Sequence, residues 1–243
     1  MRVVGLVEQA SRQNFVTEDG DPNPLELAPS LSHSAIEELE ACLPCALPDD
    51  IRELLCFCGG LVGGPIDGVD FTGANCSFEQ RELLPYGHPI AGDGFGNFWV
   101  IDLLPDSIAW GPIYLVCHDP PIFLYQSPTL EDFLSELFKL GIPPHNSLID
   151  DVHEDRLFDV WRSNPSVLNH ADCLESGDAD LRDFANGLGD TFQYIDMRDV
   201  PIGFGFSWGR YGPRTVTKRH GELRLFAYEK RQGLLSKLLG RST

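Results

Sequence analysis

The segment IAGDGFGNFWVIDL, residues 90–103, has three glycines within five positions, a composition typical of loops that bind phosphate. Such a loop needs a strand before the glycines and a helix after them, because the N-terminus of that helix holds the phosphate. Here the glycines lead into FWVIDL, residues 98–103, whose β-branched and aromatic residues predict a strand. Asp93 would also place a negative charge beside any phosphate. The segment therefore predicts a hairpin turn, in which glycines supply positive φ angles.

A second motif, GFSWG at residues 205–209, matches the G-x-S-x-G pattern of serine hydrolases, with Ser207 as the nucleophile. That chemistry needs a helix directly after the serine, and then an acidic residue followed by a histidine. The following residues, GRYGPR, predict a turn, and Glu222 is the first acid after Ser207 but already lies beyond His220. We therefore expect an aromatic-rich strand here and no enzymatic activity.

Four of the seven cysteines form a C-x-x-C plus C-x-C set, the donor type that structural zinc prefers: Cys42, Cys45, Cys56 and Cys58. Cys56 and Cys58 fall at the end of a predicted helix, where residues two apart point about 200° away from each other. They cannot both face one metal unless the helix unwinds first. We expect no metal and no cofactor, and thiols that behave as small apolar side chains.

Two further groups could suggest acid–base or metal chemistry. Cys117 precedes His118 and Asp119, but neighbours on a strand point to opposite faces, so the thiol and the imidazole would not meet. His118 and Asp119 are explained by a turn after a strand. The sequence DDVHEDR, residues 150–156, is explained by the acidic start of a helix.

The elements that must position these residues follow from hydrophobic spacing and capping signals. Residues 32–43 predict a helix with a capping box of Ser34 and Glu37, and residues 47–60 predict a second helix stopped by glycine. Three short runs rich in β-branched and aromatic residues predict an antiparallel meander: 98–103, 113–119 and 122–126. Residues 127–141 predict a closing helix with Ser127 as N-cap and Pro128 in its first position.

The remainder of the chain repeats this order on a smaller scale. Residues 141–151, GIPPHNSLIDD, are typical of a linker. Beyond it, residues 155–164 and 178–188 predict helices, and residues 234–239 predict a short final helix. Four segments predict strands: 191–197, 202–208, 214–219 and 222–230. We therefore expect an α+β fold with two regions, a domain over residues 1–145 and a smaller α+β region over residues 146–243.

Several of these motifs, in this order, carry a resemblance to a known family: LPDDIRELLCFCGG, the glycine turn with its strand, GPIYLVCHDPP and SPTLEDFLSEL. Over about residues 31–140 the chain resembles the SUKH superfamily, which groups yeast cell-wall-synthesis regulators with bacterial toxin-immunity proteins. The residues that match the family pattern are Leu47, Pro48, Leu54, Gly59, Gly60, Gly92, Asp93, Gly94, Asp102, Gly111, Pro112, His118 and Asp119. The resemblance implies N-terminal helices, a central antiparallel sheet, a closing helix, no catalysis, and protein binding.

The charge of the chain limits what it can bind. The 243 residues carry a net charge of −19, and residues 1–150 alone carry 23 acidic and 5 basic residues. Nucleic acid and anionic membranes are repelled by such a charge, so a basic protein is the expected partner. Residues 210–243 reverse the sign, with 9 basic and 2 acidic residues, and we expect this basic end to fold back on the acidic body.

The sequence start shows no apolar signal segment, and no stretch approaches the 18 apolar residues of a membrane span. An odd number of cysteines without a secretory context fits reduced thiols. We therefore expect a cytoplasmic protein, a monomer or weak dimer.

The resemblance and the charge together predict an immunity protein. It would neutralise a cognate antibacterial toxin, a nuclease delivered by a type VI-like or contact-dependent system, by occluding the basic active-site cleft. The alternative is an intracellular scaffold or regulator of the same family with no toxin partner. The residues expected to bind the partner are acids and aromatics in or beside the meander loops: Asp67, Asp70, Glu79, Glu82, Asp93, Phe95, Asp102, Asp106, Trp110 and Asp119. Tyr86 and Trp99 are further aromatic candidates.

Overall fold

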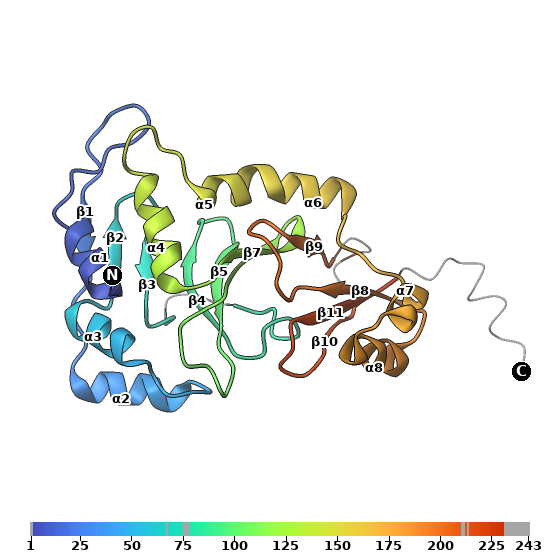
Figure 1. The fold of residues 1–243 in the computed structure, drawn as a ribbon. Helices are drawn as coiled ribbons and strands as arrows, with labels where there is room; N and C mark the ends of the chain where they lie inside the picture. Colours follow the sequence, from blue (N-terminus) through green and yellow to red (C-terminus); the bar gives the residue numbers. More distant parts are fainter. Residues whose placement is uncertain (1, 67, 75–77, 210–211, 213, 231–243) are drawn as a thin grey trace, which may run out of the picture.

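The computed structural model describes residues 2–66, 68–74, 78–209, 212 and 214–230. The described residues build an antiparallel sheet with the strand order β1-β2-β3-β4-β5-β6-β7-β9 (Figure 1). Its strands are β1 (Leu25–Leu27), β2 (Gly60–Gly63), β3 (Val69–Asp70), β4 (Gly87–Gly92), β5 (Phe98–Asp102), β6 (Ile113–His118), β7 (Pro121–Ser127) and β9 (Gly205–Ser207). Strands β5, β6 and β7 pair with one another in sequence, which confirms the predicted meander.

Helices cover one face of this sheet. Alternate residues of a strand point to opposite faces, and Trp99, Ile101 and Leu115 point into a core shared with the helices. The helices that contribute to that core are α1 (Val3–Ala10), α2 (His33–Cys42), α3 (Asp49–Phe57), α4 (Leu130–Lys139), α5 (Leu148–Asp150), the π-helix η1 (Asp151–Arg156) and α6 (Leu157–Ser163). The last three follow one another without a break, and we call residues 148–163 the helical rod.

The C-terminal part of the chain packs on the opposite face. It forms a small antiparallel sheet in the order β10-β11-β8, with two helices beside it (Figure 1). These elements are β8 (Phe192–Asp196), β10 (Thr217–Arg219), β11 (Leu225–Glu229), α7 (His170–Glu175) and α8 (Ala179–Leu188). Val100, Tyr114 and Phe123 of the large sheet share one apolar cluster with Phe206 and Phe226.

Residues on both sides of the expected boundary at 145/146 therefore share a core. Strand β9 extends this contact further, because it pairs with the edge strand β7 of the large sheet. The fold class is the predicted α+β arrangement, with N-terminal helices, a central antiparallel sheet and a closing helix. The division into a domain over residues 1–145 and a smaller region over residues 146–243 stays a prediction.

Two predicted helix caps are wrong by two residues. Helix α2 begins after Ser32, whose Oγ accepts a hydrogen bond from the Ala35 N–H at 3.2 Å, so Ser34 is not the cap. Helix α4 begins after Thr129, whose Oγ1 accepts from the Asp132 N–H at 3.1 Å. Ser127 cannot cap α4 because it is the last residue of β7, paired with Ile113.

The predicted linker over residues 141–151 is also wrong at its end, because α5 begins inside it. The Ser147 side chain accepts a hydrogen bond from the Ile149 N–H at 3.0 Å and starts the helical rod there. The predicted strands and helices over 155–230 are present in shortened form as α6, α8, β8, β9, β10 and β11. The predicted helix over 234–239 lies outside the described residues. In the part of the chain that the structure describes, no helix is long and apolar enough to cross a membrane.

Candidate protein-binding surface

The glycine turn between β4 and β5 is held by its own aspartate. Asp93 Oδ1 accepts hydrogen bonds from the N–H groups of Phe95 at 2.8 Å and Asn97 at 3.2 Å. Asn97 Nδ2 donates to Asp93 Oδ2 at 2.5 Å. Gly94 and Gly96 have φ angles of 77° and 89°, which other residues rarely adopt. The turn therefore has a fixed shape, and it opens no helix that could receive a phosphate.

A histidine of the helical rod supports this turn from behind. His153 Nε2 lies 3.2 Å from Asp93 Oδ2, and its ring packs against Trp99 with centroids 5.7 Å apart. Burial alone would raise the pKa of Asp93, but the hydrogen bonds from Phe95, Asn97 and His153 outweigh it and hold that pKa below its ordinary value. Asp93 is therefore a charged structural centre, and its side chain is only 8 % exposed.

The turn between β6 and β7 lies directly beside the glycine turn. The His118 N–H donates to Asn97 Oδ1 at 3.2 Å, and a Cβ on Gly96 would come within 2.8 Å of the His118 ring. Phe95 stands at the tip of the glycine turn and is 81 % exposed, and Asp119 is exposed on the neighbouring turn. An aromatic ring and a carboxylate are thus presented at the same end of the sheet, which we call the turn end.

The other expected contact residues lie at the opposite end of the strands. Gly87 pairs with Asp102 there, four residues along β5 from Phe98, and strands advance about 3.3 Å per residue. Asp106 is exposed in the loop between β5 and β6, and Glu79 and Glu82 are exposed in the segment that packs beside Gly87. The expected acids therefore form two separate surfaces.

Two expected contact residues are buried. Asp102 is 1 % exposed and forms a two-pronged ion pair with Arg219, whose Nη1 and Nη2 lie 2.7 and 2.8 Å from the two carboxylate oxygens. Trp110 is 2 % exposed and packs against the ring of His88 at 5.0 Å. Neither side chain offers a surface to a partner in this structure. Trp99 is buried as well.

The remaining expected residues have other roles or positions. Asp70 Oδ1 accepts hydrogen bonds from the backbone and side chain of Thr72, at 2.8 and 2.6 Å, so it shapes its own turn. Tyr86 is 44 % exposed. Asp67 lies outside the described residues.

The basic end folds back at one described position. Arg219 crosses from β10 to the Asp102 carboxylate of β5, and its Nη1 also donates to the Leu83 carbonyl at 3.3 Å. Its guanidinium lies over the ring of Phe226, 5.5 Å from the centroid. For this part of the basic end, the expected contact with the acidic body is confirmed. Residues 231–243 lie outside the described residues.

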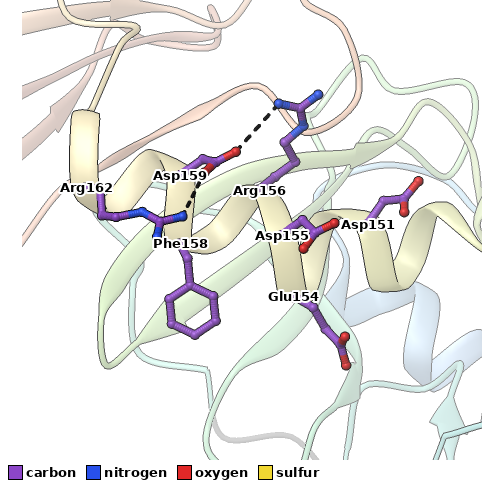
Figure 2. A pocket seen from close by; sticks show the side chains of 7 residues that line it. All are labelled: Asp151, Glu154, Asp155, Arg156, Phe158, Asp159 and Arg162. Carbon is purple, nitrogen blue, oxygen red and sulfur yellow. Dashed lines mark hydrogen bonds and ion pairs between the residues drawn. The ribbon is translucent and has the colours of Figure 1, made fainter.

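Sequence reasoning missed the outer face of the helical rod. Asp151, Glu154 and Asp155 are exposed there, and Phe158 is 52 % exposed among them (Figure 2). These side chains, which Figure 2 draws, line a pocket of about 530 Å³. The acidic run DDVHEDR was visible in the sequence, but an acidic helix start explained it. The signal that could have found the surface is Phe158 with Trp161, two aromatics three residues apart that are each followed by a charged residue.

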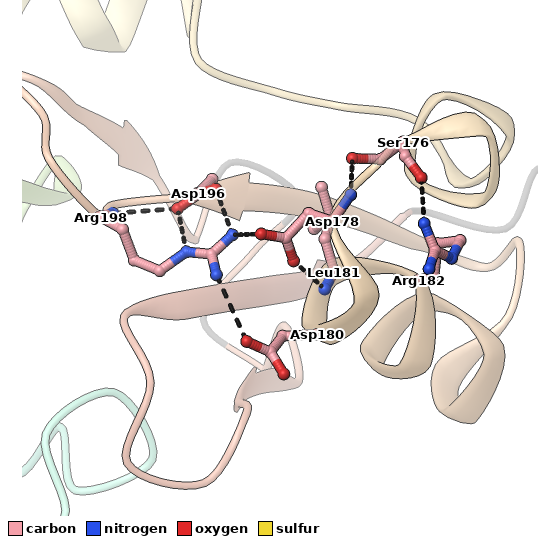
Figure 3. A network of polar contacts seen from close by, with 7 residues as sticks. All are labelled: Ser176, Asp178, Asp180, Leu181, Arg182, Asp196 and Arg198. Carbon is pink, nitrogen blue, oxygen red and sulfur yellow. Dashed lines mark hydrogen bonds and ion pairs between the residues drawn. The ribbon is translucent and has the colours of Figure 1, made fainter.

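Other acids of the C-terminal region are used internally. Arg198 is held by Asp196 at 2.7 Å, Asp178 at 2.9 Å and Asp180 at 3.6 Å (Figure 3). Hydrogen bonds from its guanidinium to Asp196 raise the pKa of Arg198 further above its ordinary value. Asp178 also caps α8 by accepting from the Leu181 N–H. This network joins α8 to β8, and its one guanidinium partly neutralises the three carboxylates.

The groups that could suggest catalysis do not assemble. Ser207 is fully buried on β9, its N–H donates to Asn164 and its Oγ donates to the Pro121 carbonyl at 3.3 Å. Cys42 and Cys56 are exposed, whereas Cys45 and Cys58 are buried. Burial raises the pKa of Cys58 to about 11, which disfavours the reactive thiolate. Among the described residues, no three histidine, cysteine, aspartate or glutamate side chains are grouped to hold a metal ion.

The chain has an α+β fold, and its turn end presents one exposed aromatic ring, Phe95, beside one exposed carboxylate, Asp119. Residues 30–136 match the model of the SMI1 / KNR4 family (SUKH-1), so this part of the chain is similar to that family. The match begins after β1, ends within α4 and covers less than half of the chain. Proteins of this family are generally non-enzymatic immunity or regulatory proteins, and they typically bind a protein partner. Comparisons with curated proteins and with solved structures gave no match.

Proposed function

We propose that the protein is an immunity protein that binds and neutralises a basic antibacterial toxin in the cytoplasm of the cell that makes it. The observation that carries the proposal is the turn end, where a rigid turn of the SUKH segment presents Phe95 at 81 % exposure beside Asp119. An exposed aromatic ring on a fixed backbone is the type of residue that anchors an interface. The exposed ring of Phe95 contributes little to the core of the protein itself.

The charge of the chain supports a basic partner. A net charge of −19 creates a negative potential around the molecule, and complementary charge raises association rates to about 10⁸–10⁹ M⁻¹s⁻¹ at low salt. A nuclease fits this requirement because its active-site cleft must attract phosphates. In this proposal the acidic loops occupy that cleft, Phe95 docks within it, and nucleic acid is excluded. A nuclease delivered by a type VI-like or contact-dependent system is the partner that we propose.

The buried residues refine the proposed contact set. Replacing Asp102 or Asp93 by lysine would break the fold, because Asp102 pairs with buried Arg219 and Asp93 holds the glycine turn. The exposed residues Phe95 and Asp119 are therefore the first candidates, and the loop-end acids Glu79, Glu82 and Asp106 form the second group. Asp67 and Asp70 remain proposed contacts of lesser weight.

Exchange of the exposed residues tests this proposal. The variants Phe95→Ser and Asp119→Lys should each weaken binding of the captured partner tenfold or more, while thermal unfolding stays as in the parent. Glu38→Lys is the matched control, because it reverses an exposed acid on α2 that is not among the proposed contacts. Equal affinity and equal salt dependence in all four proteins would mean that the turn end is not the contact surface.

A further inference from the structure

Strand β10 forms one edge of the small sheet, which has the order β10-β11-β8 (Figure 1). On the side of β11, the Val216 carbonyl accepts a hydrogen bond from the Glu229 N–H at 2.9 Å. The backbone groups of an antiparallel strand face its two sides alternately, so those of Thr217 and Arg219 face away from β11. Within the described part of the chain, these backbone N–H and carbonyl groups have no hydrogen-bond partner. The strand therefore presents an unpaired edge.

The opposite edge of the same sheet is closed by the chain itself. The Tyr194 carbonyl of β8 accepts a hydrogen bond from the Leu168 N–H at 2.8 Å, and the Tyr194 N–H donates to the Leu168 carbonyl at 3.0 Å. A row of unpaired backbone groups at a sheet edge is a template for pairing with another strand. The contrast between the two edges indicates that β10 is the side of this sheet where a further strand can be added.

A pocket of about 440 Å³ lies against this open edge. Thr217 and Lys218 of β10 line it, together with the aliphatic side chain of Leu83 and the aromatic ring of Trp208. In recognition by strand addition, main-chain hydrogen bonds supply affinity, and pockets for alternate side chains supply specificity. Strand β10 combines both features, because its unpaired backbone groups lie beside a pocket with a partly apolar lining.

The charges in this lining differ from those of the whole molecule. Glu79 and Glu82 are offset there by Arg214 and Lys218, whereas the whole chain has a net charge of −19. A strongly basic occupant is therefore not required at this pocket, in contrast to the partner that the proposed function places at the turn end.

The exposed side chains at this edge define the strand that fits it. Val216 is 41 % exposed and Lys218 is exposed, and residues two apart on a strand lie on the same face. Side chains of unlike charge stabilise two strands when they lie directly opposite each other, and side chains of like charge destabilise them. A matching strand therefore has an acidic side chain opposite Lys218 and an apolar side chain opposite Val216.

A second copy of the chain does not meet this requirement. Two β10 strands that paired antiparallel through Thr217 and Arg219 would be centred on Lys218, so the two Lys218 side chains would lie opposite each other. That contact is repulsive, and the net charge of −19 on each copy opposes the association further. The occupant is therefore a different protein.

We propose that β10 is a strand-addition site for an extended segment of a partner protein. The segment pairs antiparallel with the backbone groups of Thr217 and Arg219, places an apolar side chain opposite Val216 and places an acidic side chain opposite Lys218. Its side chains on the other face enter the pocket beside Leu83. This inference does not depend on toxin neutralisation, because it uses neither the turn end nor a basic partner.

Selection from a phage-displayed library of random heptapeptides on the full chain tests this site. We expect the selected peptides to share an acidic residue two positions from an apolar one. Lys218→Glu should weaken their binding tenfold or more, and replacing the acid of the peptide by lysine should restore binding to this variant. The matched control Lys139→Glu, which makes the same change on α4, should leave binding unchanged.

Amide hydrogen exchange followed by NMR shows whether a selected peptide adds as a strand. The amides of Thr217 and Arg219 should exchange quickly in the free chain and several-fold more slowly with the peptide bound. The Lys218 amide, which faces β11, should be protected in both states. The inference is overturned if the library yields no binder, or if binding leaves the exchange of Thr217 and Arg219 unchanged. A loss of peptide binding in Phe95→Ser would also overturn it, because the peptide would then occupy the turn end.

Discussion

Single residues at the ends of the strands decide the shape of the candidate surface. Asp93 is the central one, because it accepts hydrogen bonds from two backbone N–H groups, from Asn97 and from His153. A carboxylate in this position fixes the direction in which Phe95 points. Phe95, the residue that we propose contacts a partner, and Asp93, the residue that positions it, are therefore different, although they are only two apart in the sequence.

The charge of Asp93 predicts a pH dependence. Its pKa in the folded chain lies below the ordinary 3.8, so its contribution to stability is complete above that value and is lost as the pH falls through the folded pKa. We expect Asp93→Asn to lower the free energy of unfolding by about 1–3 kcal/mol at pH 7. The difference from the parent should shrink below pH 3.8.

Urea unfolding at pH 7 and at pH 3 measures this effect. Asp106→Asn serves as the control, because Asp106 is an exposed loop residue, and it should unfold with the parent at both values. A deficit of Asp93→Asn that is the same at both pH values would show that the charge of Asp93 does not stabilise the turn.

Asn164 is a second residue with a role that its neighbours reveal. It has a φ of 44° at the end of α6, accepts from the Ser207 N–H at 2.8 Å and donates to Tyr228 Oη. Asn164→Ala loses both hydrogen bonds and places an alanine in a left-handed conformation. We expect Asn164→Ala to lower the free energy of unfolding by about 2–3 kcal/mol. The loss for Asn164→Gly should be smaller than this by about 0.5–1 kcal/mol, because glycine tolerates the same φ. Chemical denaturation of the two variants should give this order, and the reverse order would contradict it.

The sequence could identify the glycine turn and Phe95, because both follow from local spacing. It could not show that Asp102 is buried, because its partner Arg219 lies 117 residues further along the chain. The same limit applies to Trp110, which lies between β5 and β6 and is buried against the ring of His88 on β4. Local patterns predict which residue types gather in loops, but burial depends on contacts between distant segments.

At the scale of elements, the ion pair between Asp102 and Arg219 joins β5 to β10. Both side chains are almost fully buried, at 1 % and 2 % exposure. Removal of one partner leaves a charge without compensation in the interior, whereas removal of both does not. We expect Arg219→Met to lower the free energy of unfolding by about 3–5 kcal/mol, and the double variant Asp102→Leu with Arg219→Met to recover part of that loss.

A double-mutant cycle in guanidinium chloride measures this coupling. The parent, Asp102→Leu, Arg219→Met and the double variant are the four proteins required. We expect the double variant to have a higher free energy of unfolding than Arg219→Met alone. Strictly additive losses would mean that the two side chains contribute independently and that the ion pair does not hold the C-terminal strand.

Element types were predicted well where hydrophobic periodicity was strong, as in α3, α4 and the three meander strands. Their ends were predicted less well, because a cap is decided by one hydrogen bond, such as that of Thr129 to the Asp132 N–H. Helix α1 was not predicted, and the start of the helical rod was assigned to a linker because of Pro143 and Pro144. Ser147 starts the helix only three residues after those prolines.

At the scale of the whole molecule, the large sheet is enclosed on both faces. Helices α1, α2, α3 and α4 and the helical rod cover one face, and the C-terminal region covers the other (Figure 1). The ends of the strands remain as the places where loops are presented. The C-terminal region thus buttresses the sheet, and its shared cluster with Val100 and Phe123 could not be read from either half of the sequence alone.

The central claim is that the acidic surface captures one basic toxin. The most direct measurement is a pull-down of the tagged full chain from its native organism, washed at low and then at high salt, followed by mass spectrometry and by expression of each bound protein alone. We expect one basic protein that survives the high-salt wash, is toxic when expressed alone, and is harmless when this chain is expressed with it. Several acidic or neutral partners that leave with the first wash would contradict the claim and would support a scaffold.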